Sequence, residues 1–196
     1  MNTDNHNWQW DWSKFQQIQP CNEPDFWAII NQLRNEFVAE DRHSQHNRDR
    51  LESTLITRLK ELDPYSIVAF FLRLDAEIAK INFFDMYAIY IVIEGWESLD
   101  GFYEFRNWVI TLGEPAFLDI AMDPDRLADY AYTPGERLCS YDLRIGKNVL
   151  REKTGDIPDF PIRDRATAMR GLKYEITENV FQKKFPRVWR KFWPHK

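Results

Sequence analysis

Apolar residues recur every three or four positions along most of this chain, a spacing that places them on one face of an α-helix. The spacing is clearest in residues 24–37, 51–62 and 64–78, and the charged residues 40–50 read as a connection between the first two. Asp63-Pro64 ends the second helix and begins the third, because proline is tolerated in the first turn of a helix. The core-facing residues expected in these three helices are Phe26, Ile29, Ile30, Leu33 and Phe37, then Leu51, Leu55, Leu59 and Leu62, then Ile67, Phe70, Phe71, Leu74 and Ile78.

The next segment, residues 83–94, has a pattern that fits two structures. Its sequence, FFDMYAIYIVIE, is rich in β-branched and aromatic residues, which suits a buried strand. Its length and the helical segments beside it favour a helix. We therefore predict a helix.

Residues 94–125 are the stretch around which the chain is organised. Ser98 can accept a hydrogen bond from an unpaired amide in a first helical turn, and Asp100 adds negative charge where the helix dipole favours it. Residues 102–112 are apolar on nearly every side, which predicts a helix that neighbouring helices surround. Gly113 ends this helix.

Several helix signals follow along the chain. Proline early in a helix and a Thr-x-x-Glu capping box are both signals of a helix start. They predict helices that begin at Glu114-Pro115 and at Asp123-Pro124-Asp125, a helix over residues 134–153 after Thr133, an extended loop over residues 155–165, and a helical tail over residues 175–193 with a break before Pro186.

The N-terminal residues carry Trp8, Trp10 and Trp12 at alternate positions. That period predicts an extended arm, which either docks its indoles on the domain or presents them for recognition. Taken together, the patterns predict an all-α protein of about seven to nine helices. Residues 1–23 form a Trp-rich arm and residues 24–196 a single globular helical domain.

Composition supports a packed globule, because 44% of the 196 residues are hydrophobic and 15% are aromatic. The net charge of −5 is unevenly spread. Residues 183–196 hold six Lys or Arg and no acid, which leaves residues 1–182 at −11. An acidic body disfavours nucleic acid in general and attracts basic surfaces. We therefore expect a protein partner with a basic surface.

Three features bear on the cellular compartment. Cys21 and Cys139 lie in no redox or metal motif. The first ten residues, MNTDNHNWQW, lack the basic start and apolar core of a signal peptide. The longest apolar run, residues 83–93, contains Asp85 and is too short to span a bilayer. We expect a cytoplasmic protein with reduced thiols and no membrane contact.

The central stretch also carries a resemblance. S-x-D-G-F-x-x-F-R-x-W-[LV]-I-x-x-G followed by D-P-D resembles an uncharacterised bacterial family, domain of unknown function 4240, and the likeness extends from Phe26-Trp27 to residues 185–189. In that family the turn before the central helix usually reads Gly-Gly, a variable residue, then Ser-Asp-Asp. Here Trp96 stands for a glycine and Leu99 for the first aspartate. The resemblance implies a helical domain and brings no established activity.

One histidine pair has a spacing compatible with a metal site. His43 and His46 lie near Asp41 and Asp49, but no third strong ligand stands at a recognised distance. We interpret the segment as a solvated linker.

Asp123, Asp125 and Asp129 are similar to a calcium loop only in part. Leu127 occupies the next ligand position, and the glycine and terminal glutamate of such a loop are missing. A helix N-cap followed by Pro124 explains the aspartates better. We predict no metal and no cofactor.

The strongest polar cluster combines Asp100, Arg106, Asp123 and Asp125. A cation in the middle of an apolar helix needs a carboxylate partner, so the cluster is either a buried ion-pair network or an acid–base or phosphate site. No histidine, serine elbow or glycine-rich phosphate loop accompanies it, which favours the network. The full set of candidate residues, none of them assigned as catalytic, is Glu94, Trp96, Glu97, Ser98, Asp100, Arg106, Trp108, Asp123 and Asp125.

Three functional hypotheses follow. The first is a non-enzymatic binding module, for instance an immunity-type inhibitor of a basic bacterial toxin, with residues 35–52 and 94–104 as its acidic faces. The second is a small hydrolase or phosphoryl-handling enzyme that uses Asp100, Arg106 and Asp123. The third is a nucleic-acid-associated protein that acts through its basic aromatic tail. We favour the first, with the tail docked on the acidic body.

Overall fold

A computed structural model describes residues 8–35, 45–130, 143–156 and 169–193, and the side chains of residues 45–48 are outside that description. Within these ranges nine helices are seven residues or longer and no strand occurs. The predicted all-α fold is therefore confirmed. The chain divides into two compact units, Met1–Ala76 with Tyr141–Arg163 and Glu77–Ser140 with Asp164–Lys196. Helix α4 (Pro64–Lys80) runs through the boundary without a break, and the single domain over residues 24–196 stays a prediction.

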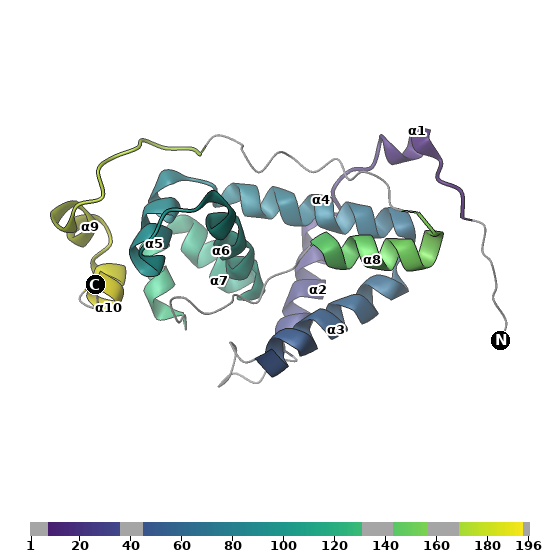
Figure 1. The fold of residues 1–196 in the computed structure, drawn as a ribbon, viewed down its shortest axis with the longest axis horizontal. Helices are drawn as coiled ribbons and strands as arrows, with labels where there is room; N and C mark the ends of the chain where they lie inside the picture. Colours follow the sequence, from purple (N-terminus) through teal and green to yellow (C-terminus); the bar gives the residue numbers. More distant parts are fainter. Residues whose placement is uncertain (1–7, 36–44, 131–142, 157–168, 194–196) are drawn as a thin grey trace. The chain divides into compact units, whose positions relative to one another are not determined.

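The first unit is a small helical bundle. It holds α1 (Trp12–Phe15), α2 (Glu23–Asn35), α3 (Gln45–Glu61), most of α4, and α8 (Leu143–Thr154). α3 packs against both α2 and α8, and the two long helices α3 and α4 lie near α8 in Figure 1. A Cβ atom at Gly146 would lie 2.2 Å from a ring carbon of Phe71, so glycine permits the close approach of α8 to α4.

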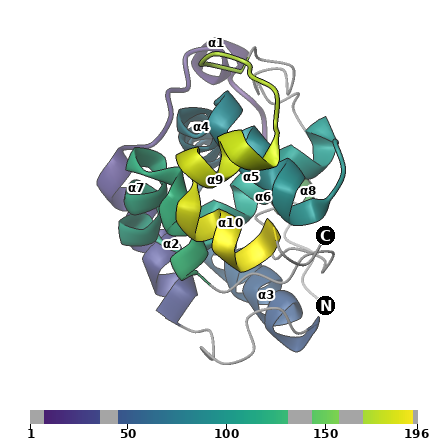
Figure 2. The same ribbon diagram turned by 90° about the vertical axis from the view of Figure 1, so that its left-hand side faces the viewer.

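The second unit carries all nine candidate residues. It holds α5 (Phe84–Glu94), α6 (Leu99–Thr111), α7 (Glu114–Met122), the 3-10 helix η1 (Pro124–Asp129), α9 (Glu178–Lys184) and α10 (Pro186–Phe192). α5 contacts α6, η1 and α10, and η1 also contacts α7 and α10. α9 and α10 lie next to each other (Figure 2).

The ambiguous segment is a helix, as predicted. α5 begins after Phe83, whose extended backbone pairs with Arg170 in an isolated β-bridge. The segment is almost entirely buried, which explains why its composition resembles that of a core strand. Its end at Gly95 is a left-handed cap, with φ of 83°.

One predicted boundary differs in the structure, and another predicted helix can be compared only in part. The charged segment 40–50 was expected to be a connection, but α3 already begins at Gln45. Asp49 and Arg50 are exposed, so a polar first turn extends the helix into solvent without needing apolar residues. Residues 131–142 lie outside the described ranges, so α8 tests only the second half of the helix predicted over residues 134–153.

The expected core faces are largely confirmed. The predicted residues of α2, α3 and α4 are buried, except that Ile29 and Leu62 are half-buried and Phe37 lies outside the described residues. Residues 8–11 of the arm have no regular secondary structure, the backbone of Asp11 is extended, and the short helix α1 follows. In the part of the chain that the structure describes, no helix is long and apolar enough to cross a membrane.

Candidate functional site

The turn between α5 and α6 begins the candidate site. Ser98 is the N-cap of α6, as predicted, and its Oγ accepts a hydrogen bond from the Gly101 backbone N–H at 3.0 Å. Asp100 lies in the first turn, where its negative charge interacts favourably with the positive end of the helix dipole. This turn is therefore fixed by the start of the helix itself.

Gly101 has a second role, because the Tyr90 hydroxyl of α5 packs against it. A Cβ atom at position 101 would lie 2.1 Å from Tyr90 Oη, a distance that no side chain allows. Burial raises the pKa of Tyr90, and the nearby charge of Glu94 adds to the effect, while the nearby Ser98 hydroxyl opposes it. The S-x-D-G sequence at this turn is thus explained by helix capping and by the contact of α5 with α6.

The outer side of the same turn exposes two large apolar residues. Trp96 is 56% exposed and Leu99 is 62% exposed. Glu97, Asp100 and Glu104 are exposed around them, and Glu94 is half-buried. Leu99 was not among our candidates, although its place beside Ser98 and Asp100, where the family usually has aspartate, was visible in the sequence.

Arg106 and Trp108 lie inside the unit, at 5% and 2% exposure. Arg106 Nη1 donates to the Ile78 carbonyl at 3.4 Å, and the guanidinium carbon lies 4.5 Å from the centre of the Phe102 ring. Glu77, which is fully buried, forms an ion pair with Lys80 at 2.7 Å on the same last turn of α4. The predicted burial of Arg106 is confirmed, and its pairing with a carboxylate stays a prediction.

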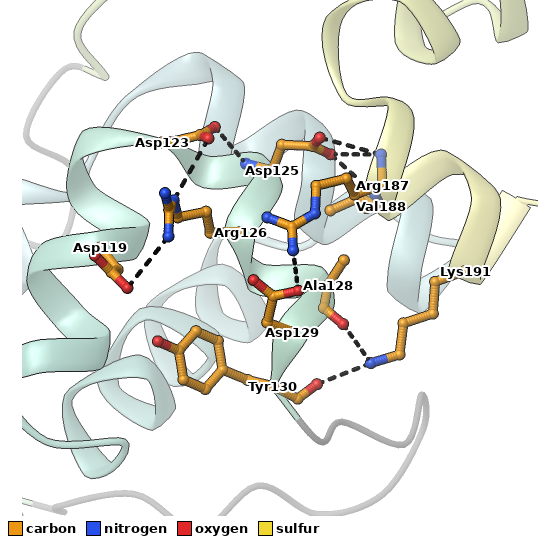
Figure 3. A network of polar contacts seen from close by, with 10 residues as sticks. All are labelled: Asp119, Asp123, Asp125, Arg126, Ala128, Asp129, Tyr130, Arg187, Val188 and Lys191. Carbon is orange, nitrogen blue, oxygen red and sulfur yellow. Dashed lines mark hydrogen bonds and ion pairs between the residues drawn. The ribbon is translucent and has the colours of Figure 1, made fainter.

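Asp123 and Asp125 serve two other helices (Figure 3). Asp123 caps η1 by accepting from the Asp125 backbone N–H at 3.2 Å. Asp125 is 6% exposed and accepts from the backbone N–H groups of Arg187 at 3.0 and 3.1 Å and of Val188 at 2.9 Å. The hydrogen bonds and ion pairs of these two aspartates among the described residues are with Asp125 N–H, Arg126, Arg187 and Val188, and not with the Arg106 guanidinium.

Asp125 therefore acts as the cap of α10 from another part of the chain. The first amides of a helix have no partner within it, and Pro186 already occupies the first position, where no N–H is available. The carboxylate of η1 satisfies the next two amides, 62 and 63 positions away. A buried carboxylate is stable here because two backbone N–H groups donate charge-assisted hydrogen bonds to it.

Cations of α10 complete the attachment (Figure 3). Arg187 forms an ion pair with Asp129, and Lys191 Nζ donates to the carbonyls of Ala128 at 2.8 Å and Tyr130 at 2.9 Å. Burial lowers the pKa of Lys191, and the charge of Asp129 partly opposes this shift. The expected docking of the tail is confirmed for residues 178–193.

A third tail cation is held at α5. Lys184 Nζ lies 2.5 Å from Asp85 Oδ1 and 4.3 Å from the centre of the Tyr174 ring. Burial raises the pKa of Tyr174 well above its ordinary value, and the nearby carboxylate of Asp85 raises it further. A tyrosine with such a pKa is a poor proton donor, so this group reads as an attachment of the α9 segment.

The metal-site candidates receive no support from the structure. Asp41 and His43 lie outside the described residues, as does the side chain of His46. Within the described ranges no group of three His, Cys, Asp or Glu is placed to hold a metal ion. Asp129, the third residue of the suspected calcium loop, is paired with Arg187.

Comparison with known proteins gives one result. No curated protein and no solved structure matches the chain significantly. A family model described as "Protein of unknown function (DUF4240)" matches residues 22–145, a range that includes α2 to α7, η1 and the turn with Trp96. The chain belongs to this family.

Proposed function

We propose that the protein is a non-enzymatic binding module that recognises a basic protein through the turn between α5 and α6. The observation that carries the proposal is the exposure of Trp96 and Leu99, three positions apart on one turn. A single exposed leucine is common on protein surfaces and needs no explanation. An exposed tryptophan on the same turn is informative, because tryptophan is enriched among the residues that dominate the binding energy of protein interfaces. We name residues 94–104 the acidic turn.

Charge supports a basic partner. The acidic turn holds Glu94, Glu97, Asp100 and Glu104 and no Lys or Arg. Apolar residues within a charged rim are the usual composition of an interface, where the rim steers the approach and the centre supplies affinity. An inhibitor of a basic bacterial toxin is one concrete form of such a module, since enzymes that attack nucleic acids need basic surfaces.

Two observations favour binding over the enzyme hypothesis. Arg106 is buried and contacts the end of α4, and Asp123 and Asp125 cap helices. Groups held in this way have little freedom to receive a substrate. The tail hypothesis also loses support, because Lys184, Arg187 and Lys191 are engaged within the molecule.

The test begins with capture of the partner from the cells of origin by the wild-type chain. Its affinity is then measured for Trp96→Ala and Leu99→Ala, with Met122→Ala on α7 as the matched control, because Met122 is 82% exposed. We expect each turn variant to weaken binding about tenfold or more, which is about 1.4 kcal/mol. All three residues are exposed, so the thermal stability of the variants should stay near that of the wild type.

Association kinetics test the role of charge. Glu97→Gln should slow association with little effect on dissociation, and added salt should slow the wild-type chain toward the rate of the variant. An association rate that salt does not change would contradict the proposal. So would full affinity in Trp96→Ala and Leu99→Ala, or a partner held by the basic tail alone.

A further inference from the structure

The first unit contains an aromatic group that the proposed function does not use. Trp8 and Trp10 of the arm and Tyr65 of α4 form three mutual ring contacts, and we name them the aromatic corner. The ring centres lie 5.8 Å apart for Trp8 and Trp10, 5.7 Å for Trp8 and Tyr65, and 5.4 Å for Trp10 and Tyr65. The interplanar angles are 78°, 55° and 86° respectively, so each ring stands steeply to the other two.

The aromatic corner is held in place from both sides. Tyr65 lies in the first turn of α4, where Asp63 accepts a hydrogen bond from its backbone N–H at 3.0 Å. Its hydroxyl accepts from the Asp11 backbone N–H at 3.0 Å, which fixes the arm. Trp10 also contacts the buried Phe15 at 5.4 Å between ring centres. The three rings are nevertheless only half-buried, so solvent reaches them.

A cation already lies on one ring of this group. Lys14 Nζ is 4.2 Å from the centre of the Tyr65 ring, within the range of a cation–π contact. The Lys14 side chain is exposed, and it can leave the ring without disturbing the core. Asp63 is close enough that the Lys14 charge acts on it, so the surroundings favour positive charge.

We infer that the aromatic corner binds a trimethylammonium group, which takes the place of the Lys14 ammonium. Aromatic faces carry negative potential and attract cations, but they accept hydrogen bonds poorly. A primary ammonium loses its bonds to water on such a surface, whereas a quaternary ammonium has no N–H to satisfy. Because the aromatic corner offers ring faces and few hydrogen-bond acceptors, we expect it to prefer the quaternary ammonium to the lysine ammonium. This site is independent of the acidic turn.

The probe is choline, and its matched control is 3,3-dimethylbutan-1-ol, which has the same shape without the charge. Binding is followed through the indole N–H resonances of the intact protein. We expect choline to bind at least tenfold more tightly than the neutral alcohol, and Lys14→Gln to bind choline several-fold more tightly than the wild type. Equal binding of the alcohol, or no gain in Lys14→Gln, would overturn the inference.

Further variants distinguish loss of the aromatic face from a general effect of substitution on the structure. Tyr65→Leu removes the aromatic face and should weaken choline binding about tenfold. Tyr65→Phe keeps the face but loses the hydroxyl that holds the Asp11 N–H, so its affinity should lie between those of the wild type and Tyr65→Leu. Trp12, which is 54% exposed and contacts Phe15, is outside the aromatic corner, so Trp12→Leu should bind normally. Loss of binding in Trp12→Leu and not in Tyr65→Leu would contradict the assignment.

Lipid vesicles distinguish two natural sources of the trimethylammonium group, a soluble ligand and a lipid head group. Binding of free choline points to a soluble ligand. Binding to phosphatidylcholine vesicles, but not to vesicles of a lipid without trimethylammonium, points to a lipid head group. Failure of both probes would overturn this inference and leave the proposed role of the acidic turn untouched.

Discussion

Single side chains at helix starts determine much of the geometry of this molecule. Ser98 and Thr177 cap α6 and α9 with their own hydroxyls, and Asp63 caps α4 with its carboxylate. The hydrogen bonds of these capping side chains should therefore contribute measurably to the stability of the protein and, for Asp63, to its dependence on pH.

Gly101→Ala should destabilise the protein although alanine is the better helix former. The new Cβ atom would meet Tyr90 Oη, and α5 or α6 would have to shift. We expect a loss of about 1–3 kcal/mol in the free energy of unfolding, measured by urea denaturation. Tyr90→Phe removes the oxygen, so most of the loss should disappear when the two substitutions are combined. A loss that is the same in both backgrounds would show that the Tyr90 contact is not the cause.

Asp63→Ala should destabilise the protein in a pH-dependent way. Burial alone would raise the pKa of Asp63, but hydrogen bonds from Ser66 and Tyr65 and the charge of Lys14 outweigh it and lower the pKa. A carboxyl group whose pKa falls on folding stabilises the protein above its unfolded pKa, and this contribution is lost as pH falls through the folded pKa.

The expected loss for Asp63→Ala at neutral pH is therefore about 1 kcal/mol. It should shrink toward zero as pH falls below the ordinary aspartate value of 3.8. Denaturation curves at several pH values measure this. Glu61→Ala is the control, because its carboxylate is exposed and, among the described residues, pairs with Arg58 of the same helix. A loss that stays constant down to low pH would refute the capping role.

At the scale of elements, the sequence predicted helices better than it predicted their partners. Prolines, glycines and capping residues marked the ends of α4, α6, α7 and α10, because these signals act within a few residues. The capping of α10 by Asp125 was not visible, since nothing in a local pattern points to an amide 62 positions away. The same residue was grouped with Arg106, which the fold turns toward the end of α4.

The exposed pair on the acidic turn was partly visible. Trp96 and Leu99 both depart from the family pattern, but only Trp96 was included among the candidates. The exposure of Leu99 depends on which side of α6 faces its neighbours, and that is decided by tertiary packing.

The attachment of α10 gives an element-scale prediction. Asp125→Ala leaves the amides of Arg187 and Val188 without acceptors, so we expect a loss of about 1–3 kcal/mol in the free energy of unfolding. Asp125→Asn keeps one amide oxygen that can accept, and it should lose less. Hydrogen exchange should show faster exchange of those two amides in Asp125→Ala. Normal exchange with a large loss of stability would indicate another origin.

At the scale of the whole molecule, buried tyrosines set the response to alkali. Burial raises the pKa values of Tyr87, Tyr90 and Tyr174, with added effects of nearby carboxylates. An acid whose pKa rises on folding stabilises the protein below its unfolded pKa, and that stability is lost as pH rises through the folded pKa.

We therefore expect these three of the eight tyrosines to ionise only when the chain unfolds in alkali. Ultraviolet absorbance of tyrosinate, recorded together with circular dichroism, measures both events. Tyr174→Phe should reduce the late absorbance step by one tyrosine. Ionisation of all tyrosines before any loss of helix would contradict the expected burial of these hydroxyls.

The bond between Asp125 and α10 also has a consequence for the order in which the structure forms. Bringing Asp125 and Arg187 together closes a loop of 62 residues. That closure costs more conformational entropy than the contact between α7 and η1, which follow each other in the chain. The attachment should therefore form after the folding barrier has been crossed. If so, Asp125→Ala will speed unfolding and leave the refolding rate nearly unchanged. Stopped-flow measurements would then identify this carboxylate as a residue that governs how long the native state lasts, with little influence on how quickly it is reached.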